Sequence, residues 1–145
     1  MIPKPVREAR ARRPLKRGGK RGKRTSERRK SRLALRRECD KRFAVAVKRR
    51  DAWRCRACGS TDRIQCAHVI SRRYHATRFM LGNAMALCAR CHMRWTHDPL
   101  GWDLFVEEKI GMAAYAELKR IAVLGVVYLD YESILLSLPE PPKLS

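Results

Sequence analysis

The sequence has few acidic residues and no long apolar run. Of its 145 residues, 14 are Asp or Glu and 34 are Lys or Arg, so the formal net charge is +20. The longest apolar run, in residues 121–129, is interrupted by Gly125 and is too short to cross a bilayer. No apolar stretch of a secretory signal follows the basic N-terminus. These absences exclude a membrane-spanning protein and predict a cytoplasmic one, with one domain of ordinary size.

The positive charge is concentrated near the N-terminus. Residues 1–38 hold 17 Lys and Arg against 3 acids, or +14, which leaves 17 against 11, or +6, for residues 39–145. Because residues 1–31 have few large apolar side chains, we predict that they form a disordered basic arm. A solubility tail or a nuclear-localisation-like run would share this composition. So dense a run favours nucleic acid, since binding releases counterions from phosphate. We expect DNA contacts from Lys16, Arg17, Lys20, Arg21, Lys23 and Arg24.

Hydrophobic spacing predicts an α+β fold with more helix than strand. Every fourth residue from Leu35 through Cys39 and Phe43 to Val47 is apolar, which indicates a helix over 32–50. Short strands are expected in residues 64–70 and 84–88. The next helix starts around 88–90 and stops before 98–99, and two more end at glycines 111 and 125. A last short helix follows the N-cap Asp130 and ends at Pro139.

Four of the six cysteines form two C-x-x-C pairs, separated by 29 residues. Two thiolates in such a turn bind one side of a tetrahedral ion, so two pairs predict a closed structural zinc site. Its ligands would be Cys55, Cys58, Cys88 and Cys91. Disulfides or a redox pair are the competing interpretation, but the chain has neither a secretory signal nor a βαβ pattern around either pair.

The other two cysteines are predicted to fill the core. Cys39 lies on the apolar face of the first helix, where a free thiol acts as a small hydrophobe. Cys66 precedes His68 by two residues, so both side chains point the same way from a strand. We expect Cys66 in the core, with an accessory place beside His68 as the alternative.

Three polar residues occur at distinctive places between and beside the cysteine pairs. His68 lies in the first predicted strand, Asn83 comes five residues before Cys88, and His92 follows Cys91. In this pattern the chain resembles the HNH endonucleases, the ββα-metal (His-Me finger) nucleases. The segments IQCAHVISRR and LCARCH, with the Thr77 to Ala84 run, resemble small phage-type HNH proteins, including relatives of NinG-like recombination nucleases.

This resemblance, which covers roughly residues 35–110, implies an HNH nuclease domain over 32–111 that includes the preceding helix. Outside it, we expect C-terminal helices packed on the domain over 112–138 and a tail at 139–145. It makes His68 the general base, Asn83 a residue that orients His68 or its loop or reaches the metal, and His92 a ligand of one catalytic divalent cation, Mg²⁺ or Mn²⁺. The implied activity is DNA phosphodiester hydrolysis, in a phage or prophage protein of the bacterial nucleoid. Further partners would be a second copy, or phage recombination or packaging proteins.

Arginines near these residues are expected to bind the DNA backbone. Arg72, Arg73 and Arg78 lie between the two predicted strands, and Arg90 lies at the start of the following helix. The resemblance places this connection and helix against the duplex, where guanidinium groups would contact phosphates. A solvated basic surface is the plainer interpretation of each one.

The sequence departs from the family pattern at Ala67, where many HNH nucleases have a metal-binding Asp or His. Asn83, His97, Asp98 or water would then have to complete the metal shell. We expect His97 beyond the end of the helix that carries His92, and not on its face. Ala67 leaves open a degenerate, non-catalytic HNH protein that binds nucleic acid. The positive charge would also be typical of a ribosome-associated zinc ribbon.

Overall fold

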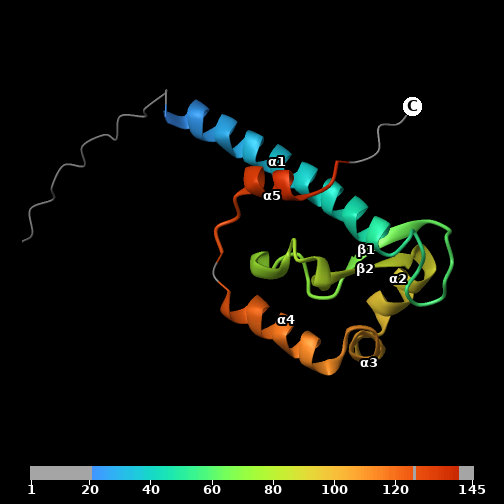
Figure 1. Cartoon of the computed structure of the whole chain (residues 1–145). Helices are drawn as coiled ribbons and strands as arrows, with labels where there is room; N and C mark the ends of the chain where they lie inside the picture. The colour runs from blue at the N-terminus through green and yellow to red at the C-terminus, as the bar shows by residue number, and fades with distance from the viewer. Residues whose placement is uncertain (1–20, 126, 141–145) are drawn as a thin grey trace, which may run out of the picture.

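The computed structural model describes residues 21–125 and 127–140, with the backbone alone for 21–27, 29 and 30 (Figure 1). The fold is α+β, as predicted: five helices and one two-stranded antiparallel sheet occur in this part of the chain. The elements are α1 (Arg21–Arg50), β1 (Ile64–His68), β2 (Ala84–Cys88), α2 (Ala89–His97), α3 (Pro99–Ile110), α4 (Met112–Leu124) and α5 (Tyr131–Ser137), with single 3-10 turns at His75–Thr77 and Leu81–Asn83.

Helix α1 begins at Arg21, eleven residues before the predicted start at 32. The prediction of a disordered arm therefore differs from the structure over 21–31. Lys, Arg and Glu are good helix formers, and a helix already nucleated by packed residues extends at little cost. Of the six arm residues expected to bind DNA, Lys16, Arg17 and Lys20 lie outside the described residues. Arg21, Lys23 and Arg24 are in α1, described by backbone alone.

The sheet lies between two groups of helices. Strands β1 and β2 pair with Ile64 opposite Cys88 and His68 opposite Ala84. On one side α1 packs Phe43 and Val47 against Ala84 of β2. On the other side α3 and α4 contribute the core formed with Met85 and Leu87, through Phe105, Val106, Tyr115 and Leu118 (Figure 1). All five residues of β2 are buried, so this short strand is the centre of the fold.

Helix α5 returns the chain to α1. Asp130 caps it as predicted, because its side chain accepts hydrogen bonds from the backbone N–H groups of Glu132 and Ser133. Leu129 and Tyr131 then pack on Cys39 of α1, which is fully buried. The Cys39 thiol donates a hydrogen bond to the Tyr131 carbonyl at 3.3 Å. The predicted core position of Cys39 is confirmed.

The described helices are too polar or too short to cross a membrane. The 30 residues of α1 are rich in Lys and Arg, and the other helices are short. Within residues 21–125 and 127–140, no helix is both long and apolar enough to cross a bilayer.

Candidate functional site

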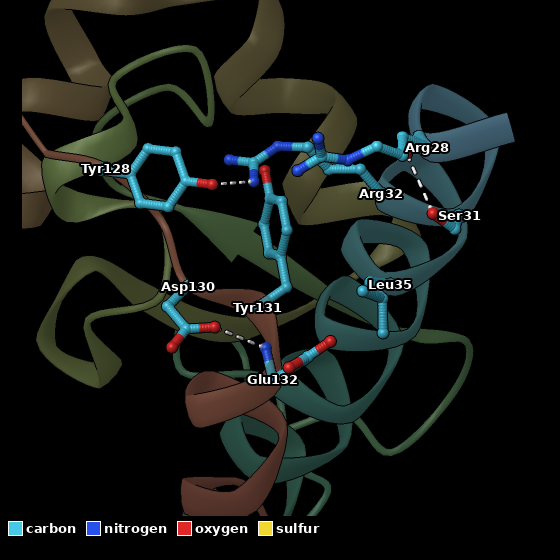
Figure 2. Close-up of a pocket in the computed structure, with 8 residues that line it drawn as sticks. All are labelled: Arg28, Ser31, Arg32, Leu35, Tyr128, Asp130, Tyr131 and Glu132. Atoms are coloured by element: carbon cyan, nitrogen blue, oxygen red, sulfur yellow. Dashed lines mark hydrogen bonds between the residues drawn. The ribbon is translucent and has the colours of Figure 1, made fainter. Parts of the chain in front are cut away.

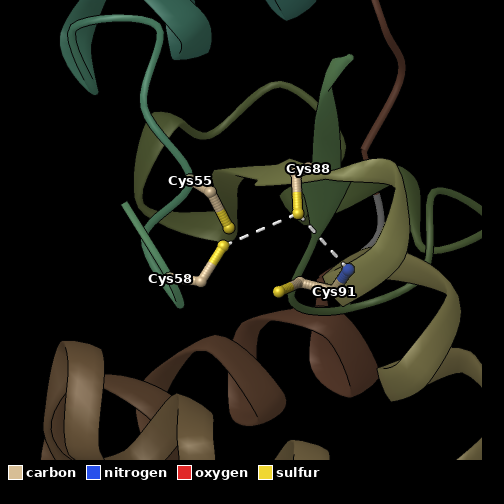
Figure 3. A group of neighbouring side chains, drawn as sticks. All are labelled: Cys55, Cys58, Cys88 and Cys91. Atoms are coloured by element: carbon tan, nitrogen blue, oxygen red, sulfur yellow. Dashed lines mark hydrogen bonds between the residues drawn. The ribbon is translucent and has the colours of Figure 1, made fainter. Parts of the chain in front are cut away.

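The two C-x-x-C pairs come together in space (Figure 3). Cys55 and Cys58 lie in the turn between α1 and β1, whose sharp bend includes Gly59 in the left-handed conformation (φ 75°). Cys88 ends β2, and Cys91 lies in the first turn of α2. The four sulfur atoms all lie within 4.8 Å of one another. The site therefore joins the turn before β1 to the junction between β2 and α2.

This cluster fits a tetrahedral metal ion. Zinc–sulfur bonds of about 2.3 Å at tetrahedral angles separate sulfur atoms by roughly 3.8 Å, and the sulfurs of Cys58 and Cys88 are 3.7 Å apart. A disulfide needs about 2.05 Å, and all six cysteines are free thiols. Burial opposes ionisation of Cys55, but backbone hydrogen bonds outweigh it and lower the pKa of this thiol to about 7. The four cysteines can hold a metal ion and are compatible with zinc.

Cys66 stands apart from this cluster. It is half-buried and packs against the group of Phe43, Val47 and Ala84. Burial raises the pKa of the Cys66 thiol to about 11, although cations including Lys48 and Arg50 lie near enough to oppose the shift. Cys66 is thus a protonated core side chain, which confirms the favoured prediction.

His68 ends β1 and is held from two sides. Its ring stacks on Phe43 of α1, with centroids 5.3 Å apart. Its Nε2 atom lies 3.1 Å from the Arg78 carbonyl oxygen. Because a carbonyl can only accept, we assign the proton to Nε2, which leaves the Nδ1 lone pair of the neutral ring unprotonated. Burial, with the charges of Arg72 and Arg78, lowers the pKa of His68 below 6.5.

His92, in the first turn of α2, faces β1. Its Nδ1 atom lies 2.7 Å from Oε1 of Gln65. An amide oxygen is an acceptor, so Nδ1 carries the proton and Nε2 has the free lone pair. Burial and the charge of Arg72 lower the pKa of His92. A neutral imidazole whose second nitrogen is held by a hydrogen bond is the usual form of a histidine metal ligand.

The two histidines line one hollow of about 170 Å³, together with Ala67, Trp95, Thr96 and Trp102. We call it the His68–His92 hollow. The zinc-compatible cluster holds the His92 side of this hollow, because Cys91 immediately precedes His92. Strand pairing sets the His68 side, since His68 lies opposite Ala84. Ala67, also in this lining, is buried, and its methyl side chain has no atom that could bind a metal ion.

The described residues offer His92 little help in binding a cation. Among them, the four cysteines are the one group of three or more His, Cys, Asp or Glu side chains close enough to share an ion. His97 is the exposed last residue of α2, so it lies within this helix and not on the turn after it, where we expected it. Asp98 caps α3 by accepting from the Gly101 N–H at 2.9 Å. The structure does not bring His97 or Asp98 into a ligand group with His92.

Asn83 is fully buried and acts on the loop between the strands. Its side-chain oxygen accepts from the Ile70 N–H at 2.7 Å, and its amide nitrogen donates to the carbonyls of Ile70 and Thr77 at 3.1 and 3.0 Å. These bonds fit the predicted role of orienting the loop. The suggested metal role is not supported, since the side chain is enclosed and does not line the His68–His92 hollow.

Arg78, which was predicted to bind the DNA backbone, is enclosed in the protein. Only 8% of the residue is exposed. Its guanidinium forms a two-point ion pair with Asp40 of α1, at 3.0 and 2.6 Å, and donates to the Arg72 carbonyl at 2.8 Å. All of these contacts are internal, so the side chain fastens the loop to α1.

The other predicted arginines are exposed. Arg72 is near both site histidines, since its charge lowers the pKa of each, and it forms no ion pair with any described residue. Arg73 stacks on Tyr74 and donates to its hydroxyl at 3.2 Å. Arg90 lies in the first turn of α2. Of the three, Arg72 is the one whose charge acts on both histidines.

Sequence reasoning missed four residues that shape the site: Gln65, Asp40, Phe43 in its contact with His68, and Asp51. The buried Asp51 accepts from the Ala86 N–H at 2.7 Å and pairs with Arg50 and Arg56, which attaches the end of α1 to β2. Of these four, only Asp40 and Asp51 could have been noticed in the sequence. Each lies in a strongly basic segment, where a carboxylate has cationic neighbours to pair with.

Comparisons of the chain with protein-family models, with curated proteins and with solved structures found no match.

Proposed function

We propose that the protein is a metal-dependent DNA endonuclease of the HNH type, with zinc in the four-cysteine site as a structural ion. One observation supports it above all others: His68 and His92 face a common hollow, and each has one nitrogen held by a hydrogen bond and the other available. A structural histidine would form one such hydrogen bond as well; the hollow that the two rings share is what favours a joint role.

In the proposed reaction, His68 is the general base. Hydrolysis of a phosphodiester requires removal of a proton from the attacking water. The Nδ1 atom of His68 is the acceptor, since Nε2 is committed to the Arg78 carbonyl. The lowered pKa keeps this ring neutral near pH 7, the state in which it can accept a proton. Phe43 restricts the ring from its stacked face and thereby orients Nδ1.

His92 would hold one divalent cation, Mg²⁺ or Mn²⁺, through Nε2. When bound, such an ion would stabilise charge on the phosphate and on the leaving oxygen. Because His92 belongs to no group of three or more described His, Cys, Asp or Glu ligands, water and phosphate oxygens would make up most of the shell. Gln65 would keep the His92 ring in the ligand orientation. The exposed guanidinium of Arg72 would bind the same phosphate.

Plasmid nicking tests this assignment. The zinc-loaded full-length protein is incubated with supercoiled DNA and Mg²⁺ or Mn²⁺, beside His68→Ala, His92→Ala and the control His75→Ala. His75 is exposed in the connection between the strands and does not line the His68–His92 hollow. We expect His68→Ala to nick about 100-fold or more slowly, the usual contribution of general-base catalysis. His75→Ala should match the wild type.

A non-catalytic, zinc-stabilised nucleic-acid-binding protein is the second candidate, and a ribosome-associated zinc ribbon is its RNA-binding form. Ala67 and the short ligand set around His92 favour it. If the wild-type protein binds DNA but nicks it with neither ion, this candidate replaces the nuclease. Equal nicking by His68→Ala and wild type would show instead that His68 is not the base.

A further inference from the structure

A second hollow, of about 590 Å³, lies between the N-terminal half of α1 and the segment leading into α5 (Figure 2). We call it the Tyr128 hollow; Arg28, Arg32 and Leu35 line it from α1, and Tyr128, Tyr131 and Glu132 from the other side. It shares no lining residue with the His68–His92 hollow. Its volume is within the range of about 300–1,000 Å³ that is usual for small-molecule sites.

An aromatic ring is held open to solvent at this hollow. The residue Tyr128 is 80% exposed, yet its position is fixed by Arg32. The Arg32 guanidinium carbon lies 4.7 Å from the Tyr128 ring centroid and 5.0 Å from that of Tyr131. Arg32 also donates to the Tyr128 hydroxyl at 2.9 Å (Figure 2), and to the Leu129 carbonyl at 3.2 Å. The Tyr128 ring is thus an oriented surface that the core does not use.

Cations follow this ring along α1. Arg28, Arg32 and Arg36 are spaced four residues apart, so they lie on one face of the helix. Arg36 and Arg32 also line a smaller adjoining hollow beside Tyr131. Two carboxylates, Asp130 and Glu132, also line the Tyr128 hollow. Asp130 is committed to the cap of α5, where it accepts from the Glu132 N–H at 3.1 Å and from the Ser133 hydroxyl at 2.7 Å.

We propose that the Tyr128 hollow binds an unpaired nucleotide of a single-stranded nucleic acid. The base would stack on Tyr128, and the flanking phosphates would contact Arg28 and Arg36. A ring with cations beside it is the combination that single-strand-binding surfaces use, because every base has a face that can stack. Bases of an intact duplex are already stacked and are not free to enter a hollow.

The carboxylate of Glu132 argues against a ligand that is phosphate alone. It would repel such a ligand, whereas the amino group of a base can donate a hydrogen bond to it.

The two hollows lie along the same helix. From Arg32 to Phe43, which stacks on His68, α1 runs eleven residues, or about 17 Å at 1.5 Å per residue. One strand could reach both hollows, but binding at Tyr128 does not require hydrolysis at His68.

Fluorescence anisotropy with a labelled oligo(dA) strand, and with the same strand paired to oligo(dT), tests the proposal at fixed salt. Divalent cations are left out, so failure of the nuclease proposal would not affect the result. We expect Tyr128→Ala to weaken single-strand binding by about 5- to 100-fold, the effect of losing one stacked base. Duplex binding should stay the same. Tyr128→Phe keeps the ring and should bind the single strand as the wild type does.

The matched control is Trp53→Ala. Trp53 is also an exposed aromatic residue beside a cation, with Lys48 Nζ 5.4 Å from its ring, but it lies outside the hollow. Its loss should leave both affinities unchanged. Unchanged single-strand binding by Tyr128→Ala would overturn the proposal. Labelled polyglutamate, measured in the same assay, is a polyanion without bases. If Tyr128→Ala weakened binding of the duplex or of polyglutamate as much as binding of the single strand, the proposal would also be overturned, because the hollow would then recognise backbone or charge and not a base.

Discussion

His68 combines burial with two nearby cations, and all three effects favour its neutral form. Burial is the largest cause of the lowered pKa, and the charges of Arg72 and Arg78 lower the pKa further. The hydrogen bond to the Arg78 carbonyl and the charge of Asp40 raise the pKa, but they do not outweigh these effects. The folded protein therefore prefers neutral His68 more than the unfolded chain does. The resulting stability is fully present above the unfolded pKa of about 6.5 and is lost as the pH falls through the lower folded value.

Removing the charge of Arg72 should raise the pKa of His68. We predict that Arg72→Gln moves the imidazole titration toward higher pH, measured by NMR on the free protein. If His68 is the base, the acid limb of nicking moves the same way, because the rate rises with the neutral fraction. Arg73→Gln, which removes a cation stacked on Tyr74, should shift the titration less. A titration curve that Arg72→Gln leaves in place would contradict the electrostatic assignment.

The ion pair between Asp40 and Arg78 should be worth more than a surface pair. Their side chains are 24% and 10% exposed, and Asp40 receives two hydrogen bonds from the guanidinium. We predict that Asp40→Asn destabilises the protein by up to about 3 kcal/mol in urea unfolding, because Arg78 keeps its charge in a largely buried place. The matched control Asp62→Asn breaks the exposed pair with Arg63 and should not change the midpoint.

At the scale of elements, Asn83 holds the loop between β1 and β2. Asn83→Asp keeps an acceptor for the Ile70 N–H but turns a carboxylate toward the carbonyls of Ile70 and Thr77. We predict a loss of about 2–4 kcal/mol, since two donors disappear and a buried charge remains. Amide hydrogen exchange should rise over residues 70–78 ahead of the helices. Exchange that rises evenly along the chain would show that Asn83 supports the whole core and not this loop.

The metal site should fasten the turn before β1 to α2. Cys58 is exposed, so Cys58→Ser costs little packing but removes one ligand. We predict loss of bound zinc and unfolding of the sheet region, measured by metal content and circular dichroism. Cys66→Ser, at a half-buried cysteine outside the cluster, should keep full metal content. A Cys58→Ser protein that stayed folded without metal would contradict a structural role.

On the scale of the whole molecule, charge divides between the N-terminal segment and the body. Residues 1–20 contain eight Lys and Arg and one Glu, and they precede α1. We predict that deleting them weakens duplex binding and reduces the slope of log affinity against log salt, by about 0.9 for each phosphate that is no longer neutralised. Zinc content and helicity of the body should not change. An unaltered salt slope would show that these residues do not bind phosphate.

Hydrophobic spacing and capping residues in the sequence predicted much of the fold. Apolar residues at every fourth place predicted the packed part of α1, and Asp130 and Pro139 predicted α5. The early start of α1 was not predicted. The residues before 32 have no apolar pattern of their own, and they are helical because the packed residues that follow them nucleate the helix. The site was foreseen as a set of residue types, but Arg78 was assigned to DNA because nothing local shows that Asp40, 38 residues away, is its partner.

The sequence by itself determined which four cysteines could hold a metal ion, the element order and the excess of positive charge, since each follows from spacing or composition. The tertiary structure alone decided which nitrogen of each histidine is free, which arginines are internal, and where Tyr128 is held open. Those properties depend on contacts between residues distant in the chain, such as Gln65 with His92 and Arg32 with Tyr128. Burial and long-range hydrogen bonds give a side chain its chemistry, and neither is a local property of the sequence.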